Sequence, residues 1–254
     1  MFNIQISSLK EIEEEQTEYI CEDWLPVPKK TVSMIVANGG VGKSWIIIQL
    51  ALRHLIKNPD EKVFAWLSED PKGLSKFRAN LICSKILGLE REKIEEKLFI
   101  SDSPTFPINL NNIQKLKEQL KDFNLILLDP LIGFYGGDEN SNADARIFMQ
   151  HFTKWASEEN KTILFIHHAA KGSGKSRGAS ALVDAVRLVY QIEKIDKSDT
   201  KRKFTIAKDN YGVKNILDCT EFERVVFPKK PIKIVFEPVE NMNISMDLKE
   251  VGDE

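Results

Sequence analysis

The stretch TVSMIVANGGVGKSWIIIQLALRHLI, residues 31–56, decides the fold of this chain. Its apolar run 31–37 is typical of a buried strand, and apolar residues recur at helical spacing from 43 to 56. Between the two lies ANGGVGKS, residues 37–44, whose glycines let several backbone N–H groups face one anion. The order of strand, glycine-rich loop and helix predicts a phosphate-binding loop at a helix N-terminus.

The chemistry of this loop, called the P-loop below, predicts a site for Mg-ATP. We expect Lys43 to reach the β- and γ-phosphates of ATP and Ser44 to ligate Mg²⁺. The other candidate nucleotide-binding residues are Asn38, Gly39, Gly40, Val41, Gly42 and Trp45.

The same motif occurs a second time, as AAKGSGKS at 169–176, again after an apolar run. An ATPase of this kind needs a later strand that ends in an acidic residue near the magnesium ion. LILLD at 125–129 meets that need for the first loop, and nothing comparable follows the second. We therefore expect ATP at the first loop.

The second loop is basic, with Lys171, Lys175 and Arg177 among its glycines. Cations on a mobile backbone suit contact with the phosphates of a nucleic-acid strand. An ordinary solvated basic loop is the alternative. Phe134 and Tyr135, in a loop predicted at 133–142, are candidates to stack on bases or simply to pack against the core.

Three acidic residues follow predicted strands. Asp129 ends the strand 125–129 and is expected to orient the water ligands of Mg²⁺, or else to be a turn residue before Pro130. Glu69 and Asp70 follow the strand KVFAWLS at 62–68, on the sheet edge where the P-loop lies. We prefer Glu69 as the base that polarises the attacking water, with a solvated turn acid as the alternative.

His167 and His168 end a strand predicted at 162–168 on the same edge. Adjacent strand residues point to opposite faces of a sheet, so the two histidines cannot share one role. One of them is a candidate to contact the γ-phosphate or the attacking water. A core histidine is the alternative, and a metal site is not expected because no third ligand is evident.

The composition is compatible with one large globular domain of 254 residues, of which 42% are hydrophobic. Its formal net charge of -2 does not indicate a nucleic-acid-binding protein, although a local basic stripe needs no overall excess. We expect three reduced cysteines, no signal peptide, no membrane span and a cytoplasmic location. The expected organisation is an N-terminal arm at 1–22, one domain at 23–240 and an acidic tail at 241–254.

Strands that alternate with helices across 31–170 predict an α/β fold with a mostly parallel, twisted sheet and helices on both faces. A further strand is expected at 98–101, and helices at 73–97, 110–121, 143–157 and 179–185. A closing run of strands predicts an antiparallel C-terminal extension, at 186–193, 202–208, 213–217 and 231–236.

Residues 22–237 resemble the RecA-type hexameric P-loop ATPases, and among them the plasmid replicative helicase RepA and its relatives. The stretches that carry the resemblance are ANGGVGKS, LSEDP, LLDPL, GDENSNA, FIHHAAKG, SRGASALVDAVR and AKDNYG, in this order. The resemblance implies a RecA-like fold, a ring with ATP and Mg²⁺ at its subunit interfaces, and single-stranded DNA through its centre. It also implies replication proteins as partners.

The resemblance further implies that Glu69 is the catalytic base, that His168 senses the phosphate and that Lys208 serves the neighbouring subunit's ATP. Related helicases have an arginine two residues after that lysine, where this chain has Asn210. Arg177, Arg202 and Lys203 are the possible substitutes. A non-unwinding DNA-binding ATPase of recombination or repair, and a protein-binding signalling or assembly ATPase, stay open as alternatives.

Overall fold

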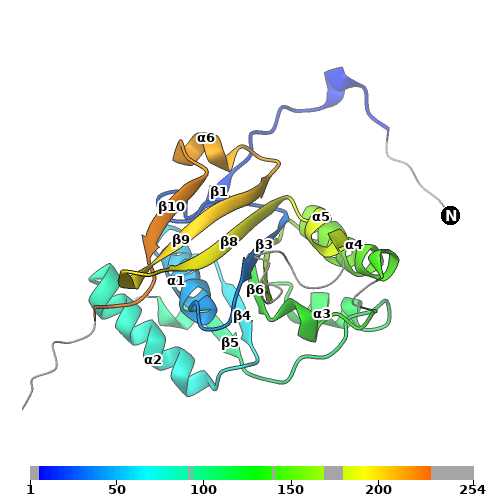
Figure 1. Ribbon diagram of the computed structural model, residues 1–254. Helices are drawn as coiled ribbons and strands as arrows, with labels where there is room; N and C mark the ends of the chain where they lie inside the picture. Colours follow the sequence, from blue (N-terminus) through cyan, green and yellow to red (C-terminus); the bar gives the residue numbers. More distant parts are fainter. Residues whose placement is uncertain (1–5, 91, 93, 139–140, 169–179, 230–254) are drawn as a thin grey trace, which may run out of the picture.

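An eight-stranded sheet forms the centre of the computed structural model, which describes residues 6–90, 92, 94–138, 141–168 and 180–229. Its strand order is β10-β9-β8-β3-β7-β6-β4-β5 (Figure 1). The six strands that pair in parallel are β3 (Val32–Ala37), β4 (Val63–Leu67), β5 (Leu98–Ser101), β6 (Leu125–Asp129), β7 (Thr162–His168) and β8 (Leu188–Ile195). The predicted parallel α/β sheet is confirmed.

The antiparallel extension is also present, although its strands differ from the predicted ones. It consists of β9 (Ser198–Asp209), which pairs with β8, and β10 (Glu221–Val225), which pairs with β9. Residues 213–217, predicted as a strand, form the short helix α6 (Val213–Leu217). The carboxylate of Asp209 accepts hydrogen bonds from the backbone N–H groups of Tyr211, Gly212 and Lys214, which turns the chain into that helix. The strand predicted at 231–236 lies outside the described residues.

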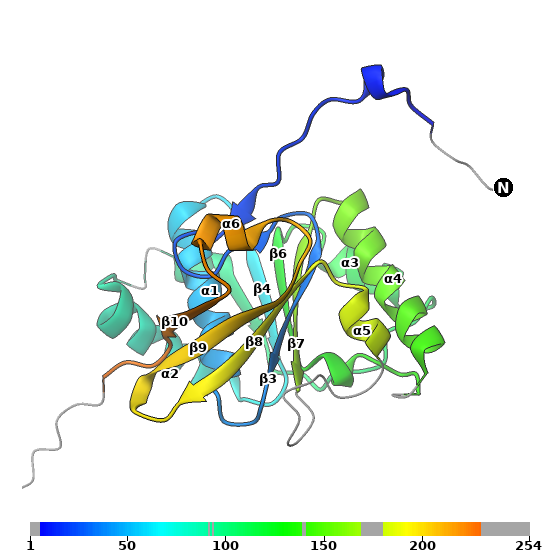
Figure 2. The ribbon, with the colours of Figure 1, turned by 45° about the horizontal axis from the view of Figure 1, so that its top comes forward.

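Helices cover both faces of the sheet (Figure 2). On one face lie α1 (Lys43–Lys57) and α2 (Lys72–Ile82), and on the other α3 (Ile113–Gln119), α4 (Asn142–Glu158) and α5 (Ser180–Asp184). Alternate strand residues divide between the two cores: Ile35 and Ala37 pack on the α1 side, whereas Met34 and Val36 pack on the α4 side. The alternation decides which side chains at the strand ends can meet.

The long helix predicted at 73–97 is much shorter. The α-helix α2 ends at Ile82, a π-helical segment continues from Cys83 to Leu87, and Gly88 then leaves the helix with a φ of 65°. Glycine takes this left-handed conformation at little cost, so it commonly ends helices. Short 3-10 helices also occur at Leu9–Glu11, Glu95–Lys97 and Leu131–Gly133.

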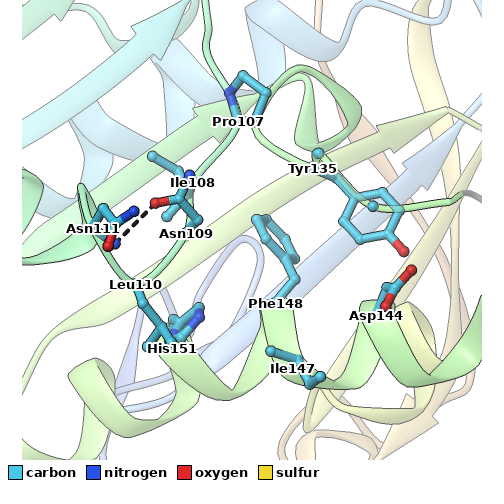
Figure 3. Close-up of a pocket in the computed structure, with 12 residues that line it drawn as sticks. Pro107, Ile108, Asn109, Leu110, Asn111, Tyr135, Asp144, Ile147, Phe148 and His151 are labelled. Carbon is cyan, nitrogen blue, oxygen red and sulfur yellow. Dashed lines mark hydrogen bonds between the residues drawn. The ribbon is translucent and has the colours of Figure 1, made fainter.

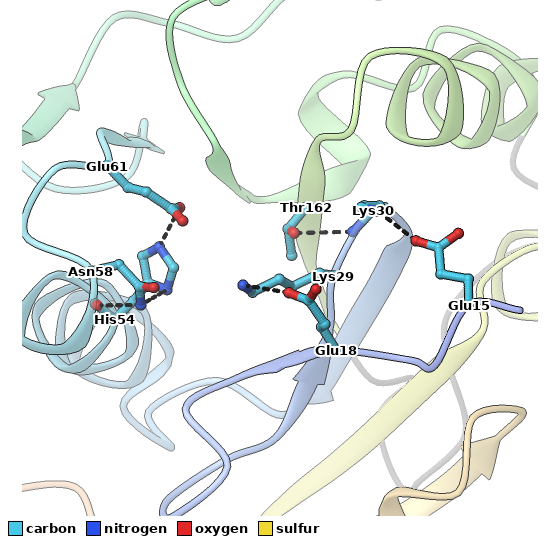
Figure 4. A network of polar contacts seen from close by, with 8 residues as sticks. All are labelled: Glu15, Glu18, Lys29, Lys30, His54, Asn58, Glu61 and Thr162. Carbon is cyan, nitrogen blue, oxygen red and sulfur yellow. Dashed lines mark hydrogen bonds and ion pairs between the residues drawn. The ribbon is translucent and has the colours of Figure 1, made fainter. Parts of the chain in front are cut away.

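The described N-terminal residues, from Ile6 onward, leave the domain as an extended arm (Figure 1). Ion pairs at its base join Glu15 to Lys30 and Glu18 to Lys29, and the backbone N–H of Lys30 also donates to Thr162 Oγ1 at 3.2 Å (Figure 4). A short ribbon of β1 (Tyr19–Ile20) and β2 (Val27–Pro28) then brings the chain into the core. Among the described helices, none is both long enough and apolar enough to cross a bilayer.

Candidate nucleotide-binding site

The P-loop connects β3 to α1. Asn38, Gly39 and Gly40 are exposed, and Gly42 has a φ of 103° immediately before Lys43 begins the helix. This left-handed residue turns the backbone into α1, so that the loop lies at the helix N-terminus, where the helix dipole favours an anion. The local arrangement therefore agrees with the predicted phosphate site.

The C-terminal strands support the loop from outside. Nε of Arg202, on β9, donates to the carbonyl oxygen of Val41 at 2.8 Å. The guanidinium of Arg202 also lies 4.5 Å from the ring centre of Phe227, which in turn lies 5.4 Å from the ring centre of Trp45. Arg202 thus contacts the P-loop of its own chain, whereas the sequence offered it only as a cation for a neighbouring subunit. Nothing in the local sequence pattern indicated this contact or the role of Phe227.

Four strand ends come together beside the loop. Register pairs Ala37 with His168 and Leu67 with Asp129, at the carboxyl ends of four strands that lie side by side. Their side-chain alternation places Asp129 and His168 on the α1 side of the sheet, because Leu127 and Ile166, two residues earlier, pack in that core. In a parallel sheet this edge is where ligands bind.

His168 lies between a cation and an acid. Its Nδ1 is 3.3 Å from Nζ of Lys43, and its Nε2 is 3.4 Å from Oε1 of Glu69. The side chain of Glu69 is about half exposed, at 55%. Lys43 is buried at the same place and also donates to the carbonyl of Asn38 at 3.4 Å. The three predicted site residues are therefore brought together by three separate elements.

Asp70 also lies at the candidate site, although its neighbour Glu69 was preferred from the sequence. Oγ of Ser44 donates to Oδ2 of Asp70 at 2.9 Å. Arg78, on α2, forms an ion pair with the same carboxylate, and its Nη2 donates to Oδ1 at 3.3 Å. The hydrogen bond from Arg78 is the main reason why the pKa of Asp70 is lowered. The sequence does contain a signal for this ion pair. Asp70 lies just before a helix, and Arg78, eight residues later, lies about two turns along that helix.

Asp129 is only 2% exposed, and its Oδ1 has no hydrogen-bond partner among the described residues. Burial, with a smaller contribution from the charge of Glu69, raises the pKa of Asp129 to about 7. A buried carboxylate oxygen without a partner, at the sheet edge where the P-loop lies, suits a hard divalent cation, so the residues present fit Mg²⁺.

No group of three potential His, Cys, Asp or Glu ligands occurs among the described residues. Magnesium here would therefore depend on phosphate oxygens and water for its remaining ligands, with Ser44 and Asp129 as the protein's contribution. This is the usual situation for Mg²⁺ that is bound together with a nucleotide.

Other predicted residues lie elsewhere. His167 is buried, at 1% exposed, and points to the sheet face opposite His168. Phe134 and Tyr135 are buried against aromatic neighbours, Trp66 and Phe148, so they pack into the core instead of presenting rings to bases. Lys171, Lys175 and Arg177 lie outside the described residues.

Lys208 lies far from its own P-loop. On β9 it pairs opposite Val189, which pairs with Met34, three residues before the end of β3 at Ala37. Its Nζ donates to the carbonyl oxygens of Asp184 at 2.6 Å and Val183 at 3.4 Å, at the end of α5. Lys208 therefore cannot reach its own P-loop from this position.

A separate pocket of about 540 Å³ lies between the segment 107–111 and one side of α4 (Figure 3). Leu110, Ile147 and Phe148 give it an apolar lining, and His151 lies at one end. Tyr135 lines this pocket, whereas none of the predicted nucleotide-site residues does.

Comparisons with known proteins agree with this geometry. The family described as "AAA domain" matches residues 2–174. The structure titled "ATPase Domain of G40P" is similar at a TM-score of 0.53 and 12% identity, over 71% of this chain and 78% of that one. The RadB recombinase structure is similar at a TM-score of 0.53 and 15% identity, over 72% of this chain and 83% of that one. These likenesses show a RecA-like fold with an antiparallel C-terminal edge.

Proposed function

Since the chain belongs to the AAA domain family, we propose that it is a ring-forming motor of the cytoplasm that uses ATP hydrolysis to act on single-stranded DNA. Within the RecA-like ATPases we place it with the plasmid replicative helicase RepA, because of the motifs quoted above. The observation that carries the ATPase proposal is the meeting of Lys43, Ser44, Glu69, Asp129 and His168 at one sheet edge.

These side chains share three tasks in the proposed reaction: binding the phosphates, holding Mg²⁺ and polarising water. Lys43 and the P-loop N–H groups, from Asn38 to Ser44, bind the phosphates. Ser44 and Asp129 hold Mg²⁺, which when bound neutralises charge on the phosphate oxygens. Glu69 polarises the attacking water, and its exposed carboxylate leaves room for that water.

His168 is proposed to transmit the state of the nucleotide. Its imidazole lies between Lys43 and Glu69. When Lys43 turns to a phosphate, the histidine loses one of its two neighbours and is free to move. The segment that follows it directly in sequence contains Lys171, Lys175 and Arg177, the proposed DNA-contacting residues. Movement of the histidine would thereby change the position of the proposed DNA-contacting segment.

Assembly into a ring, with six subunits expected, would complete the site. Lys208 cannot serve its own P-loop, and this supports its proposed role toward a neighbour's nucleotide. A cation supplied from a neighbour makes hydrolysis dependent on assembly. Of the substitutes for the missing arginine at Asn210, Arg202 is bound to its own P-loop, and Lys203 pairs with Glu221 at 2.9 Å.

The deciding experiment is steady-state ATP hydrolysis by the purified chain, with and without single-stranded DNA, over a series of protein concentrations. We expect stimulation by DNA and a steep dependence on protein concentration. Lys43→Ala should abolish hydrolysis, whereas Lys175→Ala should keep the basal rate and lose the stimulation. The reverse pattern would exchange the roles of the two loops.

Two other outcomes would lead to other functions. DNA stimulation without strand separation would favour a recombination or repair ATPase, in line with the fold shared with RadB recombinase. Hydrolysis that ignores DNA at low salt would favour a protein-binding ATPase, because phosphate contacts make DNA binding strongest at low salt. For a replicative helicase, strand separation and binding to replication proteins would then be assayed.

A further inference from the structure

The hydroxyl group of Ser44 is directed to Asp70 and not to Asp129. Oγ of Ser44 donates to Oδ2 of Asp70 at 2.9 Å, whereas Oδ1 of Asp129 has no hydrogen-bond partner among the described residues. The acid at the end of β6 is thus not the one that receives this hydrogen.

The direction of this hydrogen matters for metal binding. A serine hydroxyl has one hydrogen and two acceptor lone pairs, and a cation binds to a lone pair. The hydrogen must therefore point away from the cation and needs an acceptor of its own. An ionised carboxylate at 2.9 Å is a strong acceptor for that purpose.

Arg78 determines where the Asp70 carboxylate lies. It donates to both carboxylate oxygens, in the two-pronged manner that orients a carboxylate better than a single contact does. The side chains of the pair are only 15% and 21% exposed, so water competes weakly for them. The guanidinium also lies 5.9 Å from the ring centre of Trp45, the residue that follows Ser44. α2 and the start of α1 are thereby joined at the site.

We propose that Asp70, oriented by Arg78, is a positioning residue for the magnesium ion: it accepts the hydrogen of Ser44 Oγ and leaves an oxygen lone pair free for the metal. The inference rests on the proposed nucleotide site and gives the neighbouring acids Glu69 and Asp70 different roles. Glu69 lies beside His168 and serves the water, whereas Asp70 serves the serine.

The test measures binding of a fluorescent ADP analogue in excess Mg²⁺ and in EDTA, for the wild type and for Asp70→Ala, Asp70→Asn and Arg78→Leu. We expect affinity in EDTA to change less than about threefold and the gain in affinity on adding Mg²⁺ to fall about tenfold. Arg78→Lys should keep more of this gain than Arg78→Leu does, because a lysine can still form one ion pair with Asp70. The Mg²⁺ concentration for half-maximal ATP hydrolysis should rise by a similar factor.

The control is Lys72→Ala, on the same helix, which removes an exposed ion pair to Asp102 and should behave as wild type. A wild-type magnesium gain in Asp70→Ala would overturn the inference. So would an equal loss of affinity with and without Mg²⁺, since that pattern indicates a general structural role. Glu69→Gln separates the two proposals, because it should stop hydrolysis and keep the magnesium gain. A wild-type chain that shows this gain but hydrolyses no ATP would refute the proposed function alone.

Discussion

Nδ1 of His168 lies 3.3 Å from Nζ of Lys43, so the residue that ends β7 is in contact with the cation of the P-loop. Its other ring nitrogen, Nε2, faces Glu69 at 3.4 Å. The imidazole therefore connects the proposed phosphate-binding residue with the proposed base.

From this arrangement we predict that His168→Ala lowers kcat for ATP hydrolysis by about 10- to 100-fold. Nucleotide affinity should change by less than about threefold, because Lys43 keeps its phosphate contact. Steady-state kinetics and nucleotide titration measure the two quantities, with His151→Ala, far from the P-loop, as the control. Equal losses in affinity and kcat would contradict a sensing role.

Gly42→Ala should prevent nucleotide binding. A Cβ there would lie 2.4 Å from Cζ of Phe227, and the φ of 103° is strained for any L side chain. Adding Phe227→Ala should restore only part of the affinity, because it removes the clash but not the backbone strain. At Gly73 an added Cβ meets nothing within 4 Å, so Gly73→Ala is the matched control. Full recovery in the double variant would show that the backbone angle is unimportant.

Arg202→Ala should destabilise the fold by roughly 1–3 kcal/mol, because a buried carbonyl in the P-loop loses its partner. Nucleotide affinity should fall as well, since the loop becomes less ordered. Lys203→Ala, at the next position on β9, removes only a partly exposed pair with Glu221 and should cost less than about 1 kcal/mol. Urea unfolding and nucleotide titration provide the comparison. Equal effects of the two substitutions would argue against support of the loop by β9.

In EDTA, Asp129→Asn should be more stable than the wild type, and this difference in unfolding free energy should be larger at pH 8 than at pH 5. The pKa of Asp129 is raised to about 7, so the folded state holds a proton that the unfolded state releases near pH 4. The stability that the folded state gains from this proton is fully present below about pH 4 and is lost as the pH rises through about 7. Replacing the carboxyl should recover on the order of 2–4 kcal/mol at pH 8.

Chemical denaturation at several pH values measures this difference, with the exposed Asp122→Asn as the control. The same Asp129→Asn variant should lose the gain in nucleotide affinity on adding Mg²⁺. An unfolding free energy whose pH dependence is the same in wild type and variant would contradict the buried position of this acid.

The local patterns that predicted the fold are those that depend on near neighbours along the chain. β5, β6 and β7 occupy the predicted ranges. β6 and β7 are buried, as continuous apolar runs between polar turns indicate, whereas β5 at the sheet edge is only partly buried. The strand predicted at 213–217 was wrong, and the reason lies outside that segment. The Asp209 carboxylate accepts hydrogen bonds from the N–H groups of Tyr211 and Lys214 and so starts a helix there. Helical periodicity likewise did not show that α2 ends at Ile82.

The sequence alone determined that this chain has a P-loop between a strand and a helix, and that acids and a histidine follow later strands of a parallel sheet. Only the tertiary structure decided which of these groups meet: Asp70 with Ser44 and Arg78, His168 with Lys43, and Arg202 with the loop of its own chain. The physical reason is the separation along the chain between the residues that interact. Strand and helix patterns arise from neighbouring residues, whereas these contacts depend on strand order, register and side-chain direction, which are set by packing across the whole sheet.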